Sequence, residues 1–120
     1  MSWAPDGKRI VTASGDGTAQ IWDPATGDTL LTYTGHGAPV FAVAWSPDGK
    51  HIVTGGQDQT AQVWDPASGV PLLTYTAHQM PGKSADNLPL GTVHTLAWAP
   101  DGGRIASAAL DGTAHVWRVG

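Results

Sequence analysis

Short apolar runs, interrupted every few positions by turn residues, are the dominant pattern of this chain. Four such runs follow one another in its middle third: VFAVAW at 40–45, HIVTGG at 51–56, TAQVW at 60–64 and PLLTYT at 71–76. The connections are rich in Pro, Asp and Gly, where Pro presets φ and Gly supplies a positive φ. Gly, Pro, Thr and Val interrupt every window long enough for an amphipathic helix. We therefore predict four short antiparallel strands in a meander, and almost no helix.

The same pattern is written three times. WAPDGKRIVTASGDGTAQIWDPATG begins at Trp3, WSPDGKHIVTGGQDQTAQVWDPASG at Trp45 and WAPDGGRIASAALDGTAHVW at Trp98. Trp3 and Trp45 are 42 positions apart whereas Trp45 and Trp98 are 53 apart, so the third copy carries 11 extra residues, which lie after His78. A repeat of fixed period indicates one supersecondary unit that needs neighbours to bury its apolar face.

A unit of this length that begins with Gly-His and ends with Trp-Asp resembles the WD-repeat β-propeller family. Blades of that family are four-stranded antiparallel sheets, with strands a to d running outward from a central channel. The resemblance covers nearly the whole chain and implies an all-β, open arc of about three blades. It implies strands b-c-d for residues 1–34, a complete blade at 35–76, and strands a-b-c for 77–120 with an inserted loop at 79–91.

The resemblance also implies a hydrogen-bonded tetrad of His, Ser or Thr, Asp and Trp within a blade. The matching residues are His36, Thr54, Asp58 and Trp64 in the second copy, His78, Ser107, Asp111 and Trp117 in the third, and Thr12, Asp16 and Trp22, without a His, in the first. A His–Asp pair near a hydroxyl also allows a catalytic-triad interpretation. We favour the structural one, because a nucleophile needs an exposed oxygen beside an oxyanion site and the sequence offers none. We expect no enzymatic activity.

In this family the loops that join d to a and b to c form a partner-binding face. The matching positions are Pro39, Phe41 and Gln57 in the second copy, Thr92, His94 and Leu110 in the third, and Gly15 in the first. Phe41 and Leu110 are either exposed binding hot spots near the channel mouth or packed against a neighbouring blade. The insertion is expected on the same face, where Met80, Leu88 and Leu90 either close over it or form a plain surface loop.

Composition narrows the partners. Six Lys and Arg against ten Asp and Glu give a net charge of −4, which disfavours nucleic acid and anionic membranes because both require a basic surface. The sequence has no Cys, and its five His lack the spacing of a zinc site. No stretch resembles a signal peptide or a bilayer span. We therefore expect no metal, no cofactor, no nucleic acid, no membrane and a cytoplasmic location.

A three-blade arc leaves an apolar sheet face open at each end. Propellers close with about 4–8 blades, more than a chain of 120 residues supplies. We expect head-to-tail assembly into a closed homo-oligomer, with a trimer of nine blades favoured over a dimer of six. The expected function is a non-catalytic scaffold for a protein or peptide partner. The alternative is a propeller fragment, natural or engineered, that self-assembles and has no dedicated ligand.

Overall fold

The computed structural model describes residues 1–76, 78 and 88–119, and these residues contain β-strands joined by tight turns and no helix. The four strands predicted for the second copy are confirmed to within one residue at each end. The strands are β1 (Ser2–Trp3), β2 (Ile10–Ala13), β3 (Ala19–Trp22), β4 (Thr29–Tyr33), β5 (Val40–Trp45), β6 (Ile52–Gly56), β7 (Ala61–Trp64), β8 (Pro71–Tyr75), β9 (Val93–Trp98), β10 (Arg104–Ala109) and β11 (Ala114–Arg118).

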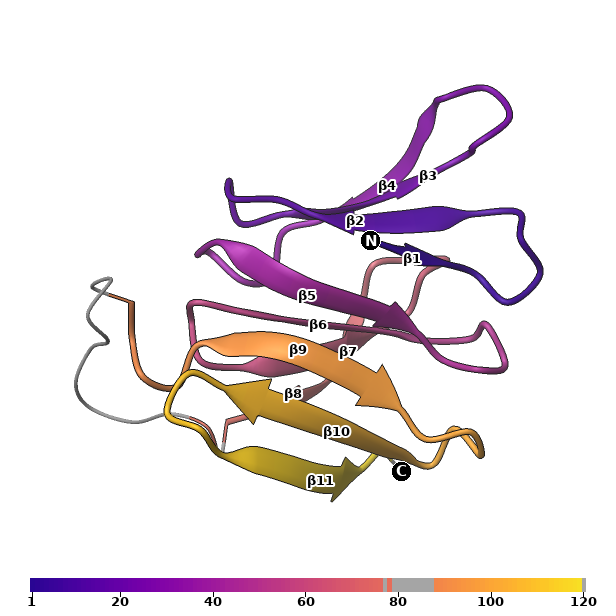
Figure 1. The fold of residues 1–120 in the computed structure, drawn as a ribbon. Coiled ribbons are helices and arrows are strands. Elements are labelled where there is room, and N and C mark those ends of the chain that lie inside the picture. Colours follow the sequence, from indigo (N-terminus) through magenta and orange to yellow (C-terminus); the bar gives the residue numbers. More distant parts are fainter. Residues whose placement is uncertain (77, 79–87, 120) are drawn as a thin grey trace.

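The strands form three antiparallel sheets, one for each copy of the repeat. The first has the order β1-β2-β3-β4, the second β5-β6-β7-β8, and the third β9-β10-β11. Figure 1 shows the sheets following one another through the molecule, with β2, β5 and β9 in neighbouring positions. The N-terminus lies on the first sheet and the C-terminus on the third, at opposite ends of the stack (Figure 1). This arrangement is that of propeller blades.

The first sheet differs from the three strands that we expected for it. Ser2 and Trp3 form a fourth strand, β1, that pairs with Val11 and Ile10 of β2. The Trp3–Ile10 pairing has the same register as Trp45–Ile52 in the second sheet. Two residues are enough for β1 because they continue directly into the Pro-Asp-Gly turn that leads to β2, in which the Gly7 N–H bonds to the carbonyl of Ala4.

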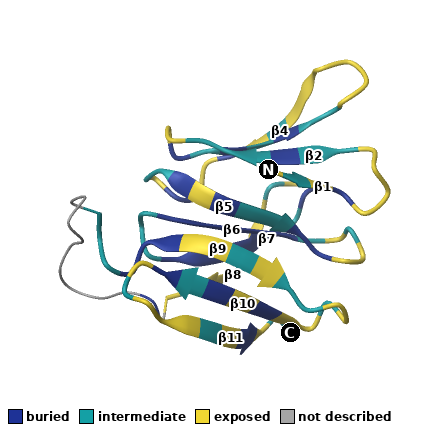
Figure 2. Cartoon of the chain, viewed as in Figure 1, coloured by how far each residue is buried: buried dark blue, intermediate teal, exposed yellow. Residues whose placement is uncertain are grey.

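Apolar clusters fill the space between neighbouring sheets. Between the first and second sheets the buried residues are Ala4, Val11, Ala19, Ile21, Tyr33, Trp45, Ile52 and Trp64. Between the second and third they are Val53, Ala61, Val63, Ile105 and Trp117. Because side chains alternate between the faces of a strand, β5, β6 and β7 of the second sheet contribute to both clusters, whereas β8 contributes Leu73 and Tyr75 to the second cluster. Figure 2 shows the result, with the most continuous burial in β6 and β7.

The turn between strands b and c has the same backbone in all three copies. Gly17, Gln59 and Gly112 occupy equivalent positions with φ of 90°, 66° and 85°. A side chain with this left-handed backbone costs about 1–2 kcal/mol, so Gln59 is strained where the other copies have Gly. The Gln59 Oε1 atom accepts a hydrogen bond from the backbone N–H of Gly91 at 3.0 Å, and thereby links the second copy to the third.

Candidate functional site

The four tetrad residues of the second copy lie together at the end of its sheet. His36 lies in the connection from β4 to β5, Thr54 on β6, Asp58 in the turn after β6, and Trp64 on β7. His36 Nδ1 lies 2.7 Å from Asp58 Oδ2, and His36 Nε2 lies 2.6 Å from Thr54 Oγ1. The Trp64 indole N–H donates to the same hydroxyl at 3.2 Å.

The direction of these bonds follows from the carboxylate. Because ionised Asp58 only accepts, His36 donates to it through the Nδ1 proton, and its Nε2 shares a hydrogen bond with the Thr54 hydroxyl. Burial by itself raises the pKa of Asp58, but the hydrogen bond and charge of His36, with the bonds from Thr60, outweigh burial and lower it. The Thr54 hydroxyl is completely buried and bonded on both sides. These groups are therefore engaged with one another, and the arrangement presents no nucleophile to a substrate.

The third copy brings together three of its four predicted residues. Ser107 Oγ lies 2.7 Å from His78 Nε2 and accepts from the Trp117 indole at 3.1 Å. Asp111 makes no hydrogen bond to His78. Its Oδ1 accepts from both the backbone N–H and the hydroxyl of Thr113, at 2.9 and 2.6 Å. His78 Nδ1 is buried and has no hydrogen-bond partner in the described part of the chain. The third copy therefore lacks the His–Asp hydrogen bond that His36 and Asp58 make in the second copy.

The two networks also differ by a histidine on strand c of the third copy. His115 occupies the position of Gln62, whose Nε2 donates to Asp58 Oδ2 at 3.5 Å and so helps to hold that carboxylate towards His36. The His115 ring instead stacks on His78, with centroids 4.0 Å apart and an interplanar angle of 19°. Burial, and then the neighbouring His115, lower the pKa of His78. The sequence signal for this pair is the change from Gln62 to His115 within the repeat, which spacing alone does not single out.

The first copy contains the reduced network that its sequence implies. The Trp22 indole donates to Thr12 Oγ1 at 2.9 Å. Asp16 accepts from the backbone and hydroxyl of Thr18, at 3.0 and 2.6 Å, and these bonds lower its pKa. Asp16 thus has the same geometry as Asp111. A tetrad Asp without a His partner folds back onto the Thr two residues later.

The residues predicted for the partner-binding face lie at one end of the sheets. Phe41 and Leu110 are 44% and 37% exposed, and Figure 2 shows the exposed positions near the starts of β5 and β9. His94 and Gly15 are also exposed, whereas Pro39 and Gln57 are half-buried. Thr92 is different, because it is completely buried and does not offer its side chain to a partner. Leu88 and Leu90 are half-buried, and Met80 lies outside the described residues.

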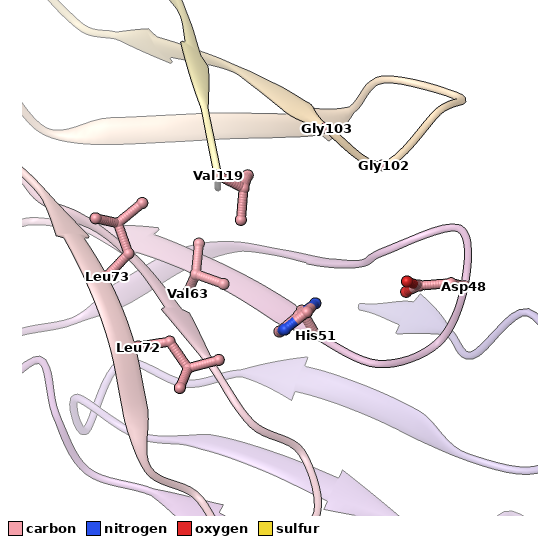
Figure 3. Close-up of a pocket in the computed structure, with 8 residues that line it drawn as sticks. All are labelled: Asp48, His51, Val63, Leu72, Leu73, Gly102, Gly103 and Val119. Atoms are coloured by element: carbon pink, nitrogen blue, oxygen red, sulfur yellow. The ribbon is translucent and has the colours of Figure 1, made fainter.

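A pocket of about 430 Å³ lies between the outer strands of the second sheet and the end of the third (Figure 3). Its apolar wall comes from Val63, Leu72, Leu73 and Val119. Its carboxylate, Asp48, is already bonded to the hydroxyl of Ser46 at 2.6 Å, which lowers the pKa of Asp48. The described residues hold no group of three His, Asp or Glu side chains suited to a metal ion. They also hold no helix long and apolar enough to cross a membrane.

Comparison with known proteins agrees with this geometry. The family model "WD domain, G-beta repeat" matches residues 1–23, 27–65 and 69–118. The chain is 48% identical over 44 residues to the Denticleless protein homolog of Danio rerio and 46% identical over 44 residues to that of Gallus gallus. Each match covers 37% of this chain but only 7% and 6% of these relatives, so the chain spans a small part of their length. The resemblance drawn from the repeats is confirmed, and the chain belongs to the WD-repeat family.

Proposed function

We propose that this chain is a non-catalytic interaction scaffold that completes its ring of blades by packing head to tail against further copies of itself. The observation that carries the proposal is a match between buried and open faces. Each interior contact joins the forward face of one sheet, which looks towards the next copy of the repeat, to the rear face of the sheet that follows. At the two ends of the stack, the rear face of the first sheet and the forward face of the third sheet are open.

The forward face is buried in the interior and exposed at the end. Val53 and Val63 of the second sheet are both 0% exposed beneath the third sheet. The equivalent residues of the third sheet are Ala106, which is exposed, and Val116, which is 68% exposed. These positions carry small or β-branched apolar side chains in both sheets.

The rear face shows the same contrast. Trp45 of the second sheet is 6% exposed, whereas the equivalent Trp3 of the first sheet is 51% exposed. Ile52 and Trp64 are buried, and their equivalents Ile10 and Trp22 are only half-buried. In each sheet these two residues share one face with the Trp that starts the row, because all three are directly opposite one another on paired strands. The open rear face of the first sheet therefore carries the same kinds of side chain as the rear face of the second sheet. Inside the chain, that second rear face packs on the forward face of the first sheet.

A contact of this kind is heterologous, so it gives a closed ring only when the rotation per chain divides the circle. Three chains with nine blades are favoured over two chains with six, because wide strands with paired Trp and Tyr side chains resist tight curvature. Each interior contact also has a Tyr stacked on a Trp, Tyr33 on Trp64 at 4.4 Å and Tyr75 on Trp117 at 4.5 Å. The described third sheet has no fourth strand to supply such a Tyr, so we expect the contact between copies to be weaker and dependent on concentration.

The loop face is the proposed site for a protein or peptide partner. Phe41 and Leu110 supply exposed apolar area, and His94 adds a polar group beside them. A mixture of exposed apolar and polar side chains at a channel mouth suits protein recognition. Absence of catalysis is part of the proposal, because the His and Asp groups that suggest a triad are used within the sheets.

The test compares two valine substitutions with opposite predictions. Val116→Asp places a charge on the open forward face, while Val70→Asp places the same charge at an exposed turn between β7 and β8. Light scattering should give the wild-type chain and V70D a mass that is a multiple of 12.4 kDa and rises with concentration. V116D should remain at 12.4 kDa. A monomeric wild type, or a V116D variant that assembles like the wild type, contradicts the proposal.

A further inference from the structure

A side chain laid over a tryptophan ring recurs at both interior contacts. The Arg9 guanidinium lies 4.7 Å from the centroid of the Trp45 ring. At the next contact the His51 ring lies 6.4 Å from the Trp98 ring, at an interplanar angle of 21°. Arg9 and His51 occupy equivalent positions just before β2 and β6, and the two Trp residues end β5 and β9. In both cases the earlier copy supplies the cationic or imidazole group and the later copy supplies the indole.

Two residues of this series make no such contact with any other described residue of the chain. Arg104 has the position of Arg9 and His51 in the third copy, and its side chain is exposed. Trp3 has the position of Trp45 and Trp98 in the first copy. Its backbone pairing with Ile10 repeats the Trp45–Ile52 pairing, so β1 presents the indole on the same face of the sheet.

The open forward face of the third sheet contains a hollow beside Arg104. It has a volume of about 270 Å³ and is lined by Ala97, Trp98, Ala99, Arg104, Ile105, Ala106 and Val116. The alanines leave room for a large flat side chain, and Arg104 supplies a cation at its rim. A guanidinium is attracted to the electron-rich face of an aromatic ring, most strongly to that of Trp, so Trp is the best aromatic partner for this site.

We propose that this hollow receives Trp3 of a second copy of the chain, with the Arg104 guanidinium over its ring. The inference rests on the head-to-tail assembly proposed above and names its central contact. An interior hydrogen bond supplies the orientation: the Trp98 indole N–H donates to the carbonyl of Ala44 at 3.2 Å. The equivalent bond between copies runs from the Trp3 indole to the carbonyl of Ala97. Arg104 thereby helps to determine which surface the rear face of a second copy binds.

A second copy fits this site better than an unrelated apolar partner. The hollow and its occupant are the two unpaired members of a contact that the chain already makes twice. No carboxylate forms an ion pair with Arg104 among the described residues, and Arg118, directly opposite it on β11, is also cationic. The electron-rich face of the Trp3 ring would therefore meet positive charge that no carboxylate neutralises.

The experiment uses complementary variants. Arg104→Glu leaves Trp3 intact, and Trp3→Ala leaves the hollow intact. Each alone should weaken self-association about tenfold or more in sedimentation equilibrium, whereas Lys50→Glu, the control with a charge reversal at an exposed turn, should not. An equimolar mixture of R104E and W3A should form a complex of one chain of each and stop there. In that complex, the only remaining ends are the two damaged surfaces.

The possible results separate this contact from the assembly itself. A monomeric wild type overturns the proposed assembly and this contact together. A wild type that assembles while R104E or W3A assembles equally well overturns the Arg104–Trp3 contact and leaves the assembly standing. At a concentration where the wild type is monomeric, the circular dichroism and urea midpoint of each variant should match the wild type, because both residues are exposed and association no longer adds stability. A variant with a lower midpoint is replaced by Arg104→Gln, for which the same loss of association is expected.

Discussion

Replacing Thr54 by Val tests the tetrad of the second copy with almost no change of shape. Thr54 Oγ1 is the acceptor for the Trp64 indole N–H and the partner of His36 Nε2, at 3.2 and 2.6 Å. Val has a methyl group in place of the hydroxyl, so the substitution creates no cavity. It removes the shared partner from two buried polar groups at once.

The magnitude follows from those two groups. A buried polar group left without a partner costs about 1–3 kcal/mol. We therefore expect Thr54→Val to lower the free energy of unfolding by about 2–5 kcal/mol, a large part of the stability of a small protein. Ser107→Ala removes the same two kinds of bond in the third copy and should have a comparable cost. Thr12→Val removes one bond from the half-buried Trp22 and should cost about 1 kcal/mol.

Urea unfolding followed by far-ultraviolet circular dichroism measures these differences. All variants are compared at one protein concentration, because association with other copies stabilises the folded state. The expected order of destabilisation is Thr54→Val at least equal to Ser107→Ala, and both greater than Thr12→Val. A Thr54→Val variant that loses no more stability than Thr12→Val refutes the idea that the shared hydroxyl holds the blade.

Two further properties can be tested: the dependence of stability on acid pH, and partner binding by the loop face. Because burial and His115 lower the pKa of His78 below its ordinary value of 6.5, its stabilising neutral form is fully present above pH 6.5, and stability falls as the pH drops through the folded value. The urea midpoint should therefore fall between pH 7.5 and 5.5, and His115→Gln should reduce that fall; an equal fall in both proteins contradicts the role of the histidine pair. Phe41→Ser with Leu110→Ser should change the free energy of unfolding by less than about 0.5 kcal/mol and leave the solution mass unchanged, while abolishing capture of a protein partner of the wild type. Unchanged capture by the double variant contradicts the site, and a wild type without any partner favours the alternative of a self-assembling propeller fragment.

The strands and their order could be predicted because the information is local. Apolar runs such as 40–45 and 60–64 end at Pro-Asp-Gly or Asp-Pro turns, and these turns stop a strand whatever surrounds it. The three copies confirmed one another, since each turn recurred at the same place. The short strand β1 was missed because two residues carry no periodic pattern, and only pairing with β2 defines it.

The site was less predictable because its details depend on competition between contacts. Asp58 bonds both to His36 and to Thr60, whereas the equivalent Asp111 bonds to Thr113 and not to His78. The hydrogen bonding of this Asp differs between a copy with an amide (Gln62) and a copy with an imidazole (His115) on strand c. The spacing of the motif does not predict that difference. The burial of Thr92 and the contact of Arg9 with Trp45 depend on how neighbouring sheets are offset. No sequence motif within one copy predicts how neighbouring sheets are offset.

Closure of a ring between copies is decided by the mass of the unmodified chain in solution. We propose that the open rear face of one chain packs on the open forward face of the next until a ring closes. Sedimentation equilibrium over a wide range of concentrations should then show the 12.4 kDa chain converting to a single larger species, which should contain three chains. A mass of 12.4 kDa at every concentration, or growth into filaments of unlimited length, contradicts it.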